Sequence, residues 1–327
     1  MKFWAFILAL LTSVACISGP APCLLAQAWP EHAVTLVTSA PQTLPWSGEP
    51  TAQYKIFKAL EPRLSRELGV PVTLLVKPEG HGVLAANMVA SAKPDGYLIG
   101  ALGPDSTITR VIQGYTPYIW GEFVPVATAW QEIYALVTLK ENRAYDLAGL
   151  APMDKQTVRL ACATNSIDAG TLLALEAARA VGFSWNLEKV DLLDPHVLLE
   201  GRADAIVMPL WNFKVHPQAH KLKVVTVFVN DDNVPCADGL PTSKSQGLNI
   251  SPPPLMAFYL PNQVNWLVRS QLSAAITNAL RQPAVQQSLE AACLKPYLED
   301  LEGVAPVMNL EYKRREDVLK LFLLMEP

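Results

Sequence analysis

The sequence predicts an α/β protein in two lobes, and two strand–loop–helix units are the main evidence. The first runs from Val34 to Val76 and contains a strand, a loop at 39–50, a helix and a second strand. The second repeats this layout at 158–182. Half of the residues are hydrophobic, which excludes a disordered chain. A chain of 327 residues is also large for one hydrophobic core and suits two domains.

The first 28 residues have the pattern of an export signal. Lys2 gives a short positive start, an apolar run follows from Phe3 to Ile17, and Ala26-Gln27-Ala28 is a small-x-small cleavage site. The apolar run is short for a membrane-spanning helix. We therefore expect residues 1–28 to be a signal peptide that is cleaved after Ala28, and the mature chain to be exported. Lipidation at Cys16 is the less favoured alternative, because the residues before it make a poor lipoprotein box.

The charge balance excludes nucleic acid as a partner. The net charge is −4 at pH 7, and removal of Lys2 with the signal makes the mature chain more acidic. A nucleic-acid-binding protein needs a basic surface, which this composition does not predict.

The helix of the first unit has apolar residues Ile56, Leu60 and Leu64 on one face, and Gly69 ends it before the next strand. A helix that follows a strand and a loop in this way presents backbone N–H groups at its start, which is a ready anion site. We expect this unit to form one side of a ligand cleft.

A glycine pattern after the second strand formally matches a dinucleotide-binding fingerprint. Gly80, Gly82 and Ala85 have the required spacing. The glycines do not follow the strand directly, however, and Asp105 is the only acidic residue near the required distance. We interpret the glycines as turn residues and expect no cofactor.

The second unit consists of a strand at 158–163, a loop at 164–171 and a helix that continues to Gly182. Ser166 and Asp168 are candidate N-caps of this helix. The repeated layout predicts that two helix N-termini face one cleft. A carboxylate at Asp168 would repel an anionic ligand there unless it is occupied as a cap.

The remaining chain alternates between short strands and helices. Further strands are expected at 133–137, 190–193, 205–208, 224–229 and 255–260, and helices at 196–201, 264–281, 285–293 and 304–325.

Three cysteines follow the signal, so at least one thiol stays unpaired. Export permits a disulfide, and the pairing of Cys162, Cys236 and Cys293 is left open. Cys162 and Cys293 both follow alanines in apolar runs, and we interpret these two as buried small hydrophobic residues.

Catalytic and metal sites are not predicted. The chain has no Gly-x-Ser-x-Gly motif, which is typical of a hydrolase nucleophile. Asp194 and the Asp231-Asp232 pair stand beside turn-forming residues, so we interpret them as turn residues rather than acid–base groups. His216 and His220 have helical metal-ligand spacing, but Pro217 lies between them, which disfavours a metal site.

The order of several short segments resembles the periplasmic solute receptors of tripartite tricarboxylate transporters, the Bug receptors. The segments span nearly the whole mature chain: Trp29-Pro30, Leu60 to Ser65, Leu68 to Val72, Lys93 to Tyr97, Phe123 to Ala127, Leu199 to Asp204, Lys221 to Lys223, Leu240 to Thr242, Leu272 to Asn278 and Gln282 to Val285.

The resemblance implies a periplasmic-binding-protein clamshell of two α/β lobes, with mixed sheets flanked by helices. Residues 29–130 with 256–327 would form lobe 1, and 131–255 would form lobe 2. Ile133–Leu139 and Met256–Leu260 are the expected crossing strands at the hinge.

The family captures small carboxylic acids without transforming them and hands them to an integral membrane permease. The resemblance therefore implies a non-enzymatic receptor, expected as a monomer, that closes about a hinge. Presentation of the closed form to a membrane sensor kinase is the alternative.

Receptors of this family grip the solute with one loop from each lobe. At the matching positions this implies ligand contacts from residues of the first loop, of the segment after the third strand, and of the second loop: Ser39, Thr43, Trp46, Ser47, Gly48, Ser106, Thr107, Thr164, Asn165 and Ser166. His81 is a possible further contact, although a turn histidine in solvent is the commoner outcome.

The first loop departs from the family pattern. The family has a Gly-Gly pair before this helix, whereas here Pro41, Pro45 and Pro50 lack an N–H and Glu49 adds a negative charge. Trp46 either stacks on a less charged ligand or fills the gap between this loop and the lobe.

Overall fold

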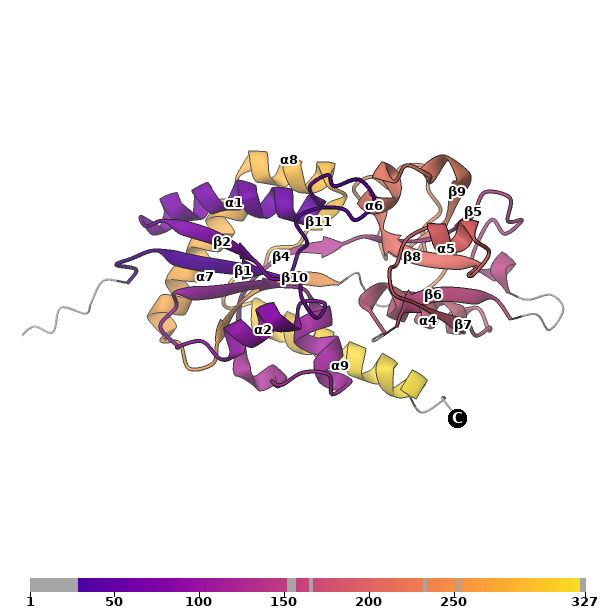
Figure 1. Cartoon of the computed structure of the whole chain (residues 1–327). Helices are drawn as coiled ribbons and strands as arrows, with labels where there is room; N and C mark the ends of the chain where they lie inside the picture. The colour runs from indigo at the N-terminus through magenta and orange to yellow at the C-terminus, as the bar shows by residue number, and fades with distance from the viewer. Residues whose placement is uncertain are drawn as a thin grey trace, which may run out of the picture.

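The computed structural model describes residues 29–151, 157–164, 167–231, 234–250, 252 and 254–323. Two mixed sheets lie side by side with helices on their faces, which gives two α/β lobes (Figure 1). The two-lobed α/β architecture expected from the sequence is confirmed. Within the described residues, no helix has the length and apolar character needed to span a bilayer.

The first lobe contains a six-stranded sheet in the order β11-β4-β10-β3-β1-β2. β1 pairs in parallel with β2 and β3, whereas β10 runs antiparallel to β3 and β4. The bounds are β1 Val34–Thr38, β2 Val72–Val76, β3 Leu98–Leu102, β4 Phe123–Glu132, β10 Leu255–Pro261 and β11 Leu294–Pro296.

Helices cover both faces of this sheet. One face packs against α1, α7 and α8, and the other against α2, η1, α3 and α9. The bounds are α1 Ala52–Leu68, α2 Val83–Ala90, η1 Asp105–Thr109, α3 Arg110–Ile112, α7 Trp266–Arg281, α8 Pro283–Ala291 and α9 Val304–Leu323. The short turn η2 (Trp120–Glu122) precedes β4.

α1 forms where its sequence predicts it. Thr51 caps the helix, because its hydroxyl accepts a hydrogen bond from the Tyr54 N–H at 3.2 Å. Gly69 ends it in the left-handed conformation at φ +72°, which glycine adopts without a steric cost. The apolar face, which includes Ile56 and Leu60, is buried against the sheet.

The second lobe contains a five-stranded sheet in the order β7-β6-β8-β5-β9. β5 runs antiparallel to β8 and β9, and β6 is parallel to β7 and β8. The bounds are β5 Tyr134–Leu139, β6 Arg159–Ala163, β7 Asn186–Val190, β8 Ala205–Pro209 and β9 Leu222–Val227, with α4 Ala169–Ala180, α5 His196–Leu199, α6 Leu210–Val215 and the turns η3 Ala148–Leu150 and η4 Ala219–Lys221.

The chain crosses between the lobes twice. β4 of the first sheet is followed, after Ile133 alone, by β5 of the second. The return lies between β9 and β10. α9 adds a third link, because it packs on the first sheet, contacts α4, and places Phe322 against the core of the second lobe.

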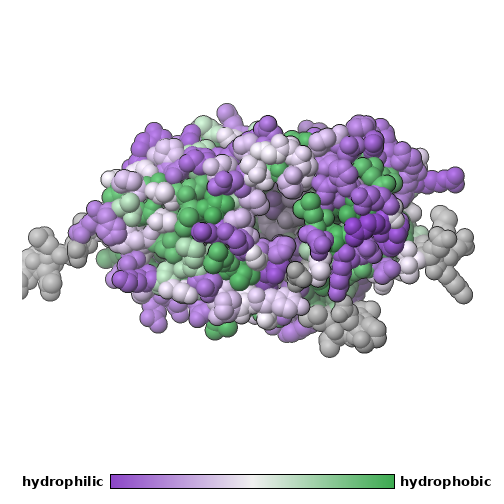
Figure 2. Space-filling view, in the orientation of Figure 1, coloured by the Kyte–Doolittle hydropathy of each residue, from purple (hydrophilic) through white to green (hydrophobic). Residues whose placement is uncertain are grey.

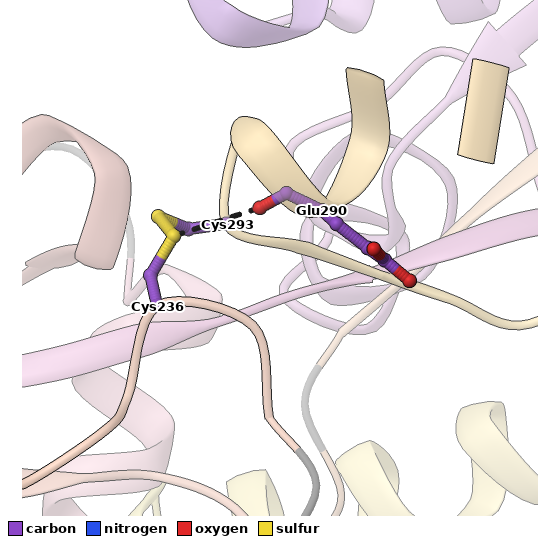
Figure 3. Close-up of a disulfide and its surroundings, with 3 residues drawn as sticks. All are labelled: Cys236, Glu290 and Cys293. Atoms are coloured by element: carbon purple, nitrogen blue, oxygen red, sulfur yellow. Dashed lines mark hydrogen bonds between the residues drawn. A yellow bond between two sulfur atoms is a disulfide. The ribbon is translucent and has the colours of Figure 1, made fainter. Parts of the chain in front are cut away.

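A disulfide forms a covalent link between the lobes (Figure 3). Cys236 lies in the loop after β9, and Cys293 lies between α8 and β11. Cys293 is buried, as its sequence context predicts, and it packs against the second lobe. The disulfide resolves the pairing that the sequence left open: Cys236 is bonded to Cys293. Cys162 is buried as expected, and it is free. Burial raises the pKa of its thiol to about 11.

Candidate ligand cleft

A cavity of about 260 Å³ lies between the two lobes. The surface is visibly hollowed between them in Figure 2. Its wall comes from both lobes: Ser39, Ala40, Pro41, Gln53, Pro78, His81, Gly103, Pro104, Asp105, Ser106, Glu132, Tyr134, Ala169, Pro254 and Met256. Several of these residues follow the carboxyl ends of β1, β2 and β3, which is where open α/β sheets bind their ligands.

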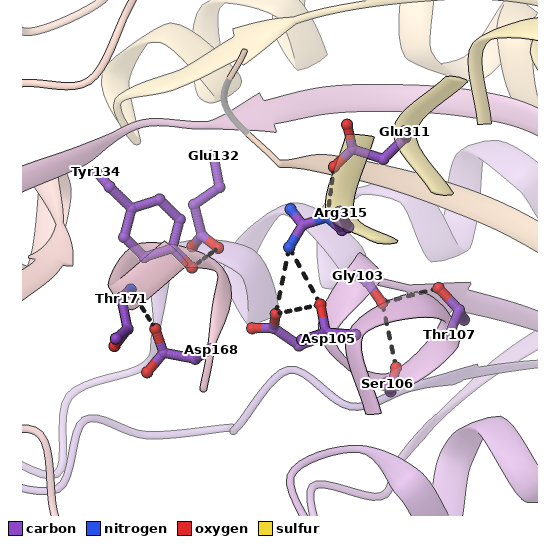
Figure 4. A network of polar contacts seen from close by, with 11 residues as sticks. Gly103, Asp105, Ser106, Thr107, Glu132, Tyr134, Asp168, Thr171, Glu311 and Arg315 are labelled. Atoms are coloured by element: carbon purple, nitrogen blue, oxygen red, sulfur yellow. Dashed lines mark hydrogen bonds and ion pairs between the residues drawn. The ribbon is translucent and has the colours of Figure 1, made fainter. Parts of the chain in front are cut away.

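Asp105 of this wall forms polar contacts with both lobes, and Figure 4 shows its pairing with Arg315. Its carboxylate forms an ion pair with Arg315 of α9 at 3.8 Å and accepts a hydrogen bond from the Thr109 hydroxyl at 3.4 Å. It also accepts a hydrogen bond from the backbone N–H of Ala169, in the second lobe. Burial nevertheless raises the pKa of Asp105, and Arg315 opposes this shift.

Asp105 is not the only carboxylate that pairs with Arg315. The same guanidinium binds the buried carboxylate of Glu311 at 2.7 Å and donates to the Thr109 hydroxyl at 3.1 Å. One cation therefore serves two carboxylates.

Asp168 is the N-cap of α4, as the sequence predicts. Its side chain accepts a hydrogen bond from the Thr171 N–H at 2.7 Å, and the Gly170 N–H also donates to it. Burial, followed by the charge of Asp105, raises the pKa of Asp168 to about 6.

Glu132 ends β4 at the crossing between the lobes. Its partly buried carboxylate accepts hydrogen bonds from the Gln53 amide at 2.7 Å and from the Tyr134 hydroxyl at 3.0 Å. Burial raises the pKa of Glu132 to about 7, and the charge of Asp105 adds to this shift. Burial and the neighbouring carboxylates also raise the pKa of the Tyr134 hydroxyl well above its ordinary value.

The structure brings two of the expected ligand residues to this cavity. Ser39 and Ser106 line it. Thr107 is fully buried behind the wall, and its hydroxyl donates to the Gly103 carbonyl. Thr164 is exposed and donates to the Asp191 carboxylate at 3.0 Å. Asn165 and Ser166 lie outside the described residues.

The rest of the first loop extends away from the cavity toward the second lobe. Trp46 packs edge-on against His216 at 4.8 Å between ring centroids, and it lines a separate cavity of about 480 Å³. Thr43 lines a third cavity, and Ser47 and Gly48 are exposed. Trp46 thus packs between its loop and the opposite lobe.

Sequence reasoning missed the polar groups Gln53, Glu132 and Tyr134. Gln53 is the second residue of α1, a helix whose strongest sequence signal is its apolar face. Glu132 and Tyr134 flank the crossing point. An acidic residue between two long apolar strands is the signal that could have pointed to Glu132.

A second polar cluster, in the other lobe, contains Asp194, His196 and His216. Asp194 accepts from the His196 backbone N–H at 2.8 Å, and its oxygens lie 2.6 Å from His196 Nδ1 and 3.4 Å from His216 Nε2. The Gln218 N–H donates to His216 Nδ1, so the ring proton of neutral His216 lies on Nε2 and faces Asp194. This arrangement fits the turn role predicted for Asp194.

His220, the other half of the sequence-spaced histidine pair, is exposed and lies 3.1 Å from the Pro217 carbonyl. It takes no part in the Asp194 cluster.

Comparison with solved structures identifies the fold. A TctC solute-binding protein from Polaromonas aligns with 89% of this chain and 99% of its own at a TM-score of 0.71 and 18% identity. The chain has the fold of a periplasmic solute-binding protein. MatC from Rhodopseudomonas palustris with bound malate aligns at a TM-score of 0.68 and 21% identity, over 89% of this chain and 99% of MatC. A second R. palustris protein, with adipate, aligns at 0.73 and 20% identity, over 89% of this chain and 97% of its own.

Sequence comparison reaches less of the chain. No family model matches it. A UPF0065 protein of Bordetella bronchiseptica is 35% identical over 78 residues, which are 24% of this chain and 21% of that protein. The chain therefore matches about a fifth of the length of this curated relative.

Proposed function

We propose that the protein is an extracytoplasmic receptor that captures a small organic solute between its lobes and presents it to the permease of a tripartite tricarboxylate-type transporter. The observation that carries this proposal is the cavity, which both lobes wall at the ends of their strands. Receptors of similar fold hold malate and adipate, which supports a carboxylate-containing solute.

The contacts across the cleft suggest how closure works. Asp105 of the first lobe accepts a hydrogen bond from Ala169 of the second, and the crossing at Ile133 is short enough to act as a hinge. A solute that touches both lobes binds the closed form better and shifts the population toward it. The permease then recognises the closed form.

Location and assembly follow from the same proposal. Residues 1–28 direct export and are removed after Ala28, and the mature monomer works in the periplasm. Its lobes comprise 29–130 with 256–327 and 131–255. The ligand contacts include Ser39 and Ser106, which line the cleft, together with Thr164, Asn165 and Ser166 of the second loop.

A thermal-shift screen of mono- and dicarboxylates, amides and amino acids tests this function. A specific ligand at a hundred times its Kd stabilises the fold by about 2.7 kcal/mol through mass action. Each hit is then titrated by calorimetry and incubated with the protein overnight. We expect at least one hit to bind with one-to-one stoichiometry and to be recovered unchanged. Turnover of the hit contradicts a receptor and indicates an enzyme.

A further inference from the structure

The wall of the interlobe cavity carries negative charge that cations compensate only in part. Among the described residues that line it, Asp105 and Glu132 are carboxylates and none is lysine or arginine. The carboxylate of Asp168 lies close behind, since the charge of Asp105 acts on it and raises its pKa. Figure 4 shows the three carboxylates on neighbouring segments of the two lobes. A dianion that entered this cavity would meet like charges, which is unfavourable.

The backbone donors that would hold an anion are already occupied at the start of α4. The N–H of Ala169 donates to Asp105, and those of Gly170 and Thr171 donate to Asp168. The chain's own carboxylates thus take the place of an anionic ligand at this helix N-terminus.

The first loop offers few backbone N–H donors to a bound anion. Pro41, which lines the cavity, has no N–H. The N–H groups of Ala40, Leu44 and Gly48 all donate to oxygens within the same segment: the Thr38 hydroxyl, the Glu49 carbonyl and the Leu44 carbonyl. These three N–H groups are therefore not available to a bound anion.

Glu132 is the group that most needs a cation. Its carboxylate accepts hydrogen bonds from two neutral donors, Gln53 and Tyr134. The neighbouring charge that acts on it is the negative charge of Asp105, and no positive charge of a described residue offsets it. Asp105, by contrast, forms an ion pair with Arg315, and the charge of Arg110 also acts on it. A partly buried carboxylate without a counter-ion is costly, and a protonated amine supplies both the charge and three hydrogen-bond donors.

We propose that this cleft selects a solute that carries a protonated amine, with the ammonium group bound by Glu132 and Asp105. The inference rests on the proposed receptor function and narrows its solute class. Glu132 and Asp105 line the cavity between the lobes, which provides space for a bound solute and places residues of both lobes around it. An amino acid or an aminated carboxylic acid satisfies both proposals.

The test compares three probes with the same five-carbon chain: glutarate, 5-aminopentanoate and 1,5-diaminopentane. Each is titrated calorimetrically into the mature protein, with calcium and magnesium chloride as further arms in place of the amines. We expect at least one amine-bearing probe to bind about ten times more tightly than glutarate, as one charge-assisted contact allows. Tighter binding of glutarate, or binding of the divalent ions alone, overturns the amine assignment.

Two variants locate the interaction. Glu132→Gln keeps the shape of the side chain and removes its charge, and we expect it to weaken amine binding about tenfold or more. Glu141→Gln makes the same change in the exposed turn after β5 and leaves affinity unaltered. Equal affinity of both variants overturns the role of Glu132.

A pH series on the wild-type chain gives a readout that does not depend on a variant. Glu132 faces Gln53 of α1, Tyr134 of β5 and Asp105 of η1, and His81 lines the same cavity. Glu132 must lose its proton to bind an ammonium group, so amine affinity should rise from about pH 5.5 to about pH 8. A fall over this range contradicts the proposal.

The thermal-shift screen separates this proposal from the receptor function on which it rests. If every hit lacks a cationic group, the receptor function stands and amine selection fails. If the screen has no hit, both fail.

Discussion

Cys236 of the second lobe is bonded to Cys293 of the first, so the two lobes are joined by a disulfide as well as by the crossing segments. The bond closes a large loop, because 57 positions separate the cysteines. The Cys236 sulfur also lies 3.6 Å from the Glu290 carbonyl oxygen of α8, which places the loop close to that helix (Figure 3). A clamshell with such a link opens less widely than one that is held by its hinge alone.

Removal of this disulfide should both destabilise and loosen the protein. We expect the double variant Cys236→Ser, Cys293→Ser to lose about 2–4 kcal/mol of unfolding free energy, since a crosslink restricts the unfolded chain. Urea denaturation measures the loss. Small-angle X-ray scattering of the ligand-free form should show a larger radius of gyration.

Cys162→Ala is the matched control for that experiment, because it removes a buried thiol and no crosslink. We expect a smaller loss of stability and an unchanged radius of gyration. A double variant that behaves like this control contradicts a restraining role for the disulfide.

The contact between Asp105 and Ala169 predicts how one substitution alters closure. Asp105→Ala removes the acceptor of the Ala169 N–H and leaves Arg315 with Glu311 as its carboxylate partner. Loss of a partly buried charged partner costs about 1–3 kcal/mol. We expect a lower melting temperature and, in scattering, a more open ligand-free form. Unchanged scattering indicates that this hydrogen bond does not hold the lobes together.

Stability should fall as the pH rises from about 5 to about 8. The folded-state pKa values of Glu132 and Asp168 are raised to about 7 and about 6, from ordinary values of 4.5 and 3.8. In this window the folded chain binds more protons than the unfolded chain, so the stabilisation is full at low pH and is lost through the folded pKa. The lowered pKa values of Asp194 and Asp204 affect stability only at pH values below this window. Melting temperatures across the pH series measure the slope, and Glu132→Gln should flatten it.

The N-cap of α1 offers a test of the local structure. Thr51→Ala removes the acceptor of the Tyr54 N–H and should cost about 1 kcal/mol. Thr51→Ser retains the hydroxyl and should cost much less. Equal losses in urea denaturation would show that the methyl group, and not the cap, stabilises this position.

The fold could be predicted from sequence largely because local signals agree with it. Gly69 ends α1, Asp168 caps α4, and the turn before β3 has Gly96 at φ +84°. Strand ends were less predictable. The strand expected at 190–193 lies at Asn186–Val190, because its position is set by pairing with β6 rather than by its apolar residues.

The site depended on contacts between residues far apart in sequence. Three contacts join the two lobes: the Cys236–Cys293 bond, the hydrogen bond from Ala169 to Asp105, and the packing of Trp46 on His216. The spacing of these residues in the sequence does not predict which of them meet. Ser39 and Ser106 could be placed because each follows a strand whose carboxyl end borders the cleft.

The most direct test of solute capture in the interlobe cavity is a titration of the best hit of the screen into Ser39→Phe. Ser39 lines the cavity, and an aromatic side chain there occupies the space of the solute. Ser91→Phe, at the exposed end of α2, is the control. The account predicts roughly a hundredfold weaker binding for Ser39→Phe and wild-type affinity for the control. Wild-type affinity in both variants would place the solute elsewhere and contradict the account.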